Sequence, residues 1–70
     1  MVNMQTLVFN STEKTAVLQE GFRGNEIMSF KDVPTVRVEN GYYEVMQTTD
    51  TGKVPVLRVP MANTNMLIQK

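Results

Sequence analysis

The sequence predicts an all-β fold, either a small barrel or a two-layer β meander. Two turn signals and the alternation around them carry this prediction. Asn40-Gly41 separates two alternating runs of residues, and Thr49-Asp50-Thr51-Gly52 separates the second run from a third. Asn-Gly is strongly preferred in two-residue type I′ turns, because both central residues there take a positive φ. Short strands joined by short turns are typical of small barrels and sandwiches.

The Asn40-Gly41 turn fixes the pairing of the strands on either side of it. A two-residue loop places Glu39 opposite Tyr42, and the other pairs follow in step. These pairs are Val38 with Tyr43, Arg37 with Glu44, Val36 with Val45, and Thr35 with Met46. Because opposed residues share a face of the sheet, we expect the valines on one face and the Arg37–Glu44 pair on the other.

The second turn predicts the pairing of the third strand. We expect Asp50, Thr51 and Gly52 to form its loop, as a type I turn with Gly52 left-handed and a G1 bulge. Thr49 then lies opposite Lys53. Counting back gives Met46 with Val56, Val45 with Leu57, Glu44 with Arg58, and Tyr43 with Val59. The residues expected to face the core are Val36, Val38, Tyr43, Val45, Leu57 and Val59. Both turns therefore predict the same inner face.

Further strands are expected before and after this meander. After an irregular start over residues 1–4, we predict strands at Gln5–Asn10, at Glu26–Phe30 and at residues 66–69. We also predict a loop over residues 21–25 and a 3₁₀ turn within residues 61–65. Thr15–Glu20 has two interpretations. It is a strand pairing back on residues 7–10, or a helix with Ser11 as N-cap and Gly21 as its stop. We favour the strand, because a helix of about two turns is short.

From Glu26 onward this layout resembles the SH3 fold. Residues 26–32 look like the segment that enters the first long strand of SH3 domains, and Asn40-Gly41 stands where their n-Src loop would be. Residues 49–52 are similar to their distal turn, and residues 59–63 look like the 3₁₀ turn before their last strand. The resemblance covers about two-thirds of the chain. It implies a small SH3-like barrel. The chain has no tryptophan and no aromatic motif near residues 7–10, so the resemblance does not extend to a proline-peptide groove.

Composition narrows the possible functions. The chain has 70 residues, which is one domain at a size where a single core is marginal. It has no cysteine and no histidine, which excludes disulfides, Cys/His metal sites and the usual nucleophile–base pairs. We therefore expect no catalytic residue, cofactor or metal, and a protein that is not an enzyme. The lack of cysteine fits a cytoplasmic location, and no apolar run is long enough to span a membrane.

The outer face of the meander is the predicted partner-binding surface. Its expected residues are Tyr42, Met46, Val54 and Val56 in an apolar strip, and Arg37, Glu44 and Arg58 in a charged row. An exposed apolar strip on a small domain is typical of a contact surface. The other interpretation is that the chain's own N-terminal segment covers the strip. The charged row is interpreted as a cross-strand ion cluster, with anion binding as its alternative.

These observations favour a small interaction or regulatory module that binds a protein partner or a second copy of itself. Compact cysteine-free domains of this kind are common among accessory proteins of microbes and their phages. Nucleic acid is the weaker candidate partner, because seven basic and seven acidic residues give zero formal net charge. That alternative would use Tyr42, Arg37, Arg58 and Lys53 as a stacking and phosphate surface. A third alternative is a small-molecule or nucleotide site between subunits.

Overall fold

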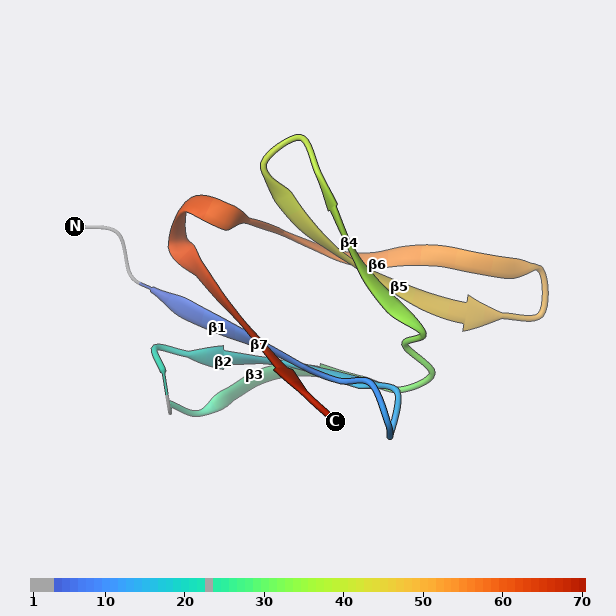
Figure 1. The fold of residues 1–70 in the computed structure, drawn as a ribbon, viewed down its shortest axis with the longest axis horizontal. Helices are drawn as coiled ribbons and strands as arrows, with labels where there is room; N and C mark the ends of the chain where they lie inside the picture. Colours follow the sequence, from blue (N-terminus) through green and yellow to red (C-terminus); the bar gives the residue numbers. More distant parts are fainter. Residues whose placement is uncertain (1–3, 23) are drawn as a thin grey trace.

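The computed structural model describes residues 4–22 and 24–70, and most of these residues lie in β-strands (Figure 1). The strands are β1 (Gln5–Asn10), β2 (Thr15–Glu20), β3 (Glu26–Phe30), β4 (Thr35–Glu39), β5 (Tyr42–Thr49), β6 (Gly52–Pro60) and β7 (Thr64–Gln69). A 3₁₀ turn, η1 (Met61–Asn63), separates β6 from β7. The all-β prediction is confirmed, as is the strand interpretation of Thr15–Glu20. Parts of the expected irregular start and loop, residues 1–3 and 23, lie outside the described residues.

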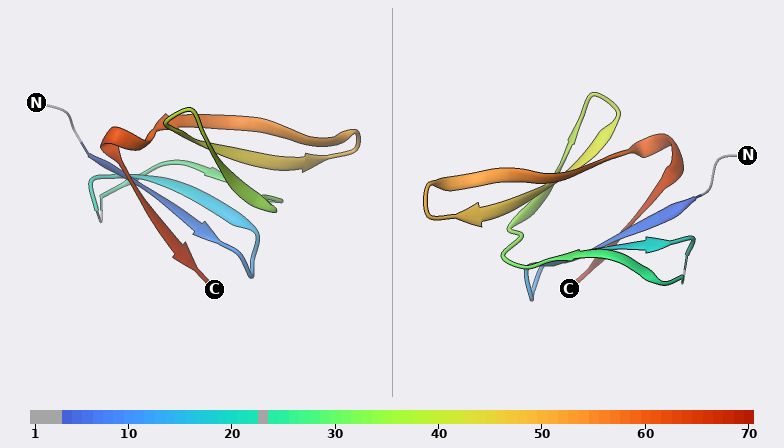
Figure 2. Two further views of the ribbon diagram at one scale, coloured as in Figure 1. Left: turned by 45° about the horizontal axis from the view of Figure 1, so that its top comes forward. Right: turned by 180° about the vertical axis from the view of Figure 1, so that it is seen from behind.

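The described strands form two sheets, so the two-layer arrangement is the one observed rather than a closed barrel. One sheet has the order β3-β2-β1-β7 and the other the order β4-β5-β6. The sheets face each other, and the β5–β6 hairpin extends past the edge of the larger sheet (Figure 2). β1 pairs antiparallel with β2 and parallel with β7, which places Leu7 between Leu18 and Met66. The parallel pairing explains how the last strand closes the larger sheet.

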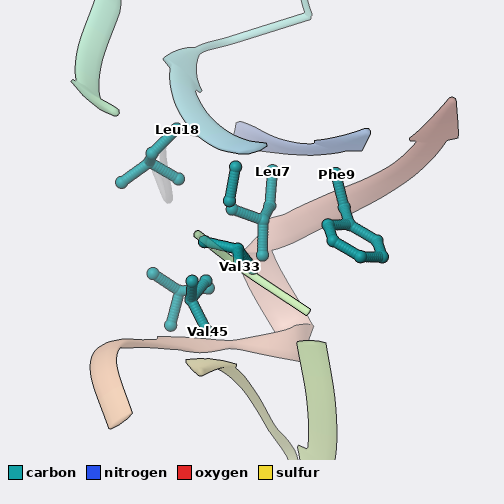
Figure 3. Packing of buried hydrophobic residues seen from close by; sticks show 7 residues of the cluster. Leu7, Phe9, Leu18, Val33 and Val45 are labelled. Carbon is teal, nitrogen blue, oxygen red and sulfur yellow. The ribbon is translucent and has the colours of Figure 1, made fainter. Parts of the chain in front are cut away.

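The core lies between the two sheets. Its buried apolar residues are Leu7, Phe9, Ala16, Leu18, Val33, Val45 and Val59. Figure 3 shows Leu7 and Leu18 facing Val33 and Val45 across this space. Val33 comes from the link between β3 and β4 and is fully buried, and its N–H donates to the Lys14 carbonyl at 2.8 Å. The link is thereby anchored to the end of the β1–β2 turn.

The first hairpin has the predicted register. Asn40 and Gly41 have φ values of 51° and 79°, as a type I′ turn requires, and Glu39 lies opposite Tyr42. Within its inner face, Val45 is buried and Val36 is half-buried. Val38 is the exception, because the residue is 61% exposed although the sequence predicted it to be buried. It lies on an edge strand, next to the turn, where the other sheet does not cover it.

The second hairpin differs from its prediction by one residue. Thr49 lies opposite Gly52, so the loop holds only Asp50 and Thr51, although Gly52 has the expected positive φ, 124°. A shift by one residue would turn every inner side chain outward. A bulge between Val45 and Met46 absorbs the shift, and Val45 still lies opposite Leu57. Beyond the bulge Met46 faces Pro55, so the predicted pair with Val56 is wrong.

The turn geometry predicts the effect of substitutions at Gly41. A Cβ at this position would meet no atom within 4 Å, so any cost is conformational. Gly41→Val should lower the free energy of unfolding by about 1–3 kcal/mol, because a β-branched residue resists positive φ. Gly41→Asn is the matched control and should cost less, since asparagine tolerates this conformation. Urea denaturation measures both, and equal midpoints for the two variants would contradict a type I′ turn.

Candidate functional site

The charged row on the outer face of the smaller sheet forms as predicted. Arg37 on β4, Glu44 on β5 and Arg58 on β6 lie opposite one another in one cross-strand row. The Glu44 carboxylate is placed between the arginines, with Oε1 3.9 Å from Arg37 Nη1 and Oε2 3.7 Å from Arg58 Nε. Arg37 also donates from Nη2 to Glu39 Oε2 at 2.9 Å. The strand register therefore brings these charged groups together on one face.

Tyr42 belongs to the same face and contacts Arg58. The guanidinium carbon of Arg58 lies 5.0 Å from the centroid of the Tyr42 ring, within the range of a cation–π contact. The Tyr42 side chain is 39% exposed, and the Arg58 side chain remains about half exposed. Arg58 is thus held between an aromatic ring and a carboxylate while about half of its side chain stays open to solvent. We call Arg37, Glu39, Tyr42, Glu44 and Arg58 the outer-face cluster.

The outer-face cluster is electrically balanced. It contains two arginines and two glutamates, and each arginine has a carboxylate oxygen within 4 Å. The two cross-strand pairs of Glu44 contribute about 0.2–1 kcal/mol each to stability. The carboxylates offset the positive potential that an anion would need. The cluster is therefore suited to a partner surface with alternating charges rather than to a simple anion.

The predicted apolar strip beside the charged row does not form. Met46 is only 7% exposed, and Val56 is half-buried and packs against the core. Val54 lies opposite Gln47, which places it on the opposite face from Tyr42. The bulge between Val45 and Met46 accounts for the two β6 residues, because it removes Val56 from the ladder and shifts Val54 by one residue. Of the four expected strip residues, Tyr42 is the one that remains exposed on the outer face.

The bulge lies where the β3–β4 link approaches β5. The Gln47 side chain donates from Nε2 to the Lys31 carbonyl at 3.0 Å, and the Thr48 N–H donates to the Asp32 carbonyl at 2.8 Å. Met46 itself lies between Thr35 on β4 and Pro55 on β6. This part of β5 is thus covered within the molecule and does not serve as an open contact surface.

Exposed apolar residues lie elsewhere, on strands that the sequence did not connect with binding. On β7, the side chains of Leu67 and Ile68 are 48% and 61% exposed, and on β3 the side chain of Ile27 is 52% exposed. The available signal for β7 was its composition, because residues 64–69 contain no charge and no proline. The sequence predicted only a closing strand over residues 66–69, and the observed strand begins two residues earlier, at Thr64.

Residues 4–22 and 24–70 contain no pocket, and no group of acidic side chains among them could hold a metal ion. No helix in that part of the chain has the length and apolar character needed to cross a membrane. The arrangement offers exposed surfaces for contact.

Comparison of the chain with protein-family models, with curated proteins and with solved structures finds no match.

The burial of Met46 predicts a stability effect. Met46→Lys should lower the free energy of unfolding by about 2 kcal/mol or more, because a charged group would replace a buried thioether. Val38→Lys is the matched control, at a residue that is 61% exposed on the neighbouring strand, and should change stability by less than about 0.5 kcal/mol. Chemical denaturation tests the pair, and similar losses would mean that Met46 is not buried.

The charged row predicts a salt-dependent contribution. Glu44→Gln should cost about 0.2–1 kcal/mol per lost pair at low salt, and the loss should shrink as salt screens the arginines. Glu13→Gln is the control, on the exposed β1–β2 turn. Unfolding free energies at low and high salt measure both variants. A loss at Glu44→Gln that equals the loss at Glu13→Gln, or that does not shrink with salt, would contradict an electrostatic contribution of the row.

Proposed function

We propose that this chain is a small, non-enzymatic interaction module that binds a protein partner through the outer-face cluster. The observation that carries this proposal is the exposed Arg58–Tyr42 stack held against Glu44. Tyrosine and arginine are enriched among the residues that contribute most to binding. A guanidinium already held by a ring and a carboxylate loses less conformational entropy when a partner arrives.

The chemistry of the cluster indicates what kind of surface would fit it. Arg37, Arg58 and Glu39 have side chains about half exposed, whereas Glu44 is only 13% exposed. A complementary partner would present a carboxylate or carbonyl group to each arginine and a donor to Glu39. An apolar or aromatic group would cover the Tyr42 ring. Such pairing gives specificity and speeds association more than it adds affinity.

The two alternative functions have less support. A nucleic-acid surface built from Tyr42, Arg37, Arg58 and Lys53 would have to bring phosphates close to the Glu39 and Glu44 carboxylates. A small-molecule or nucleotide site would need residues from more than one subunit, because the described part of the chain has no pocket. A cytoplasmic location and a microbial or phage source remain predictions from composition.

The test is quantitative capture of partners from the native host. The baits are the wild type, Tyr42→Ala, Arg58→Ala and, as a matched control, Lys53→Ala on the exposed part of β6. We expect a protein recovered by the wild type and by Lys53→Ala to bind the two cluster variants about tenfold more weakly, a loss of about 1.4 kcal/mol. Thermal melts establish that each bait is folded.

Three results would contradict the proposal. Equal affinity of a recovered partner for all four baits would remove the cluster from the interface. Recovered nucleic acid whose affinity falls steeply with salt would favour the nucleic-acid alternative. A rise in melting temperature with added nucleotide, in the absence of any protein partner, would favour the small-molecule alternative.

A further inference from the structure

The described sheets have four open edges, and three of them carry features that discourage pairing with another strand. These features are Glu26 and a bulge at β3; Arg37 and Glu39 on β4; and Lys53, Pro55, Arg58 and Pro60 on β6. Charges, prolines and bulges at an edge oppose the addition of a further strand. In a two-fold pair, a charge near the axis would also approach its own copy.

The fourth edge, β7, has none of these features. Its sequence, Thr-Asn-Met-Leu-Ile-Gln, has no charge and no proline, and its pairing with β1 is regular. Leu67 and Ile68 are exposed at this edge. A short, uncharged, β-favouring segment without proline is the pattern that pairs with copies of itself. Among the four edges, β7 is therefore the one suited to accept a strand.

The hydrogen bonds of β7 show which backbone groups are directed outward. The Ser11 N–H donates to the Gln69 carbonyl at 2.9 Å, so the backbone groups of Gln69 point toward β1. The N–H and C=O of one residue lie on the same side of a strand, and the side alternates along it. Leu67 thus also points toward β1, while the backbone groups of Met66 and Ile68 point away from the sheet. The outward N–H of Thr64 is already donated to the Met61 carbonyl.

We propose that β7 pairs antiparallel with β7 of a second copy of this chain, about a two-fold axis at Leu67. Met66 of each copy then lies opposite Ile68 of the other, and each such pair exchanges both backbone hydrogen bonds through its outward groups. On the other face of the sheet, Leu67 lies opposite Leu67 of the second copy, and Asn65 lies opposite Gln69 of the second copy. The pairing covers the two exposed apolar residues and matches amide with amide.

The two symmetric registers with the axis one residue away, at Met66 or at Ile68, are less complementary. An axis at Ile68 would place Leu67 opposite Gln69, and Met66 opposite Lys70, which lies beyond the end of β7. An axis at Met66 would place Asn65 opposite Leu67 and Thr64 opposite Ile68, which sets polar against apolar side chains. It would also require the Thr64 N–H that is already bonded within η1. Any register that pairs an outward residue with an inward one fails, because the hydrogen bonds cannot form. The Leu67 register is the one in which both the backbone and the side chains match.

This dimer is separate from the proposed function. The sequence placed self-association on the apolar strip of the smaller sheet, which does not form, whereas β7 belongs to the larger sheet. The outer-face cluster lies on the smaller sheet, and its role in binding a partner can hold or fail independently.

Engineered disulfides test the proposal directly, because the chain has no cysteine of its own. In the Leu67 register the two Leu67 Cα atoms form a non-hydrogen-bonded pair about 4.5 Å apart, close enough for a disulfide. Gln69→Cys is the matched control on the same face of β7, where the two copies lie roughly four residues, about 13 Å, apart along the strands. Ile27→Cys is the control for the β3 edge. Far-UV circular dichroism establishes that each variant is folded.

We expect Leu67→Cys to form a covalent dimer under mild oxidation about tenfold faster than either control, since only its thiols can meet without backbone movement. Sedimentation of the wild type should show an average mass that rises with concentration, and Leu67→Lys should abolish that rise. Equal oxidation rates for the three cysteine variants, faster oxidation of Ile27→Cys, or a wild type that stays monomeric across the series would each overturn the proposal.

Discussion

The register of β5 is the constraint on which the rest of this structure depends. Its first turn, Asn40-Gly41, sets one pairing, and its second turn sets a pairing that differs by one residue. The two are compatible because β6 carries one extra residue opposite the step between Val45 and Met46. Near the first turn, the resulting register keeps Val45 and Val59 in the core and places Glu44 between Arg37 and Arg58. Near the second turn, the extra residue takes Val54 and Val56 out of the apolar strip that a regular ladder would have formed.

A small core explains why several apolar residues remain at the surface. The core between the sheets consists of a few buried side chains, of which Leu7 and Val33 are fully buried. Val38 at the end of the first hairpin and Ile68 at the end of β7 lie beyond this region, although both are on strands that contribute to the core. A chain of 70 residues has limited means to cover such positions. They are therefore the places where binding can bury further apolar surface.

Local chemistry was sufficient to predict most of the fold. The strands, the first hairpin and the 3₁₀ turn follow from alternation, from Asn40-Gly41 and from Pro60. The length of the second loop did not follow, because Thr49-Asp50-Thr51-Gly52 fits either two or three loop residues. The parallel pairing of β1 with β7 was also missed, since it joins segments far apart in the sequence and no turn specifies it.

One part of the candidate site could be predicted from local sequence and the other could not. The charged row was predictable because it lies on the first turn's side of the bulge, where the register follows from Asn40-Gly41. The apolar strip was not, because Met46, Val54 and Val56 lie at or beyond the bulge. Their positions depend on tertiary contacts, including the packing of Val56 on the core and the bond from the Thr48 N–H to the Asp32 carbonyl. These contacts involve residues distant in the sequence and cannot be read from a local pattern.

The pairing of β5 with β6 can be measured most directly by nuclear Overhauser contacts between their backbone protons. We expect contacts that place Glu44 opposite Arg58 and Met46 opposite Pro55, with Val56 unpaired between the two registers. We also expect the Met46 side chain to contact other protons of the protein and to be shielded from solvent. Contacts that place Met46 opposite Val56, with the Met46 methyl group open to water, would contradict this pairing.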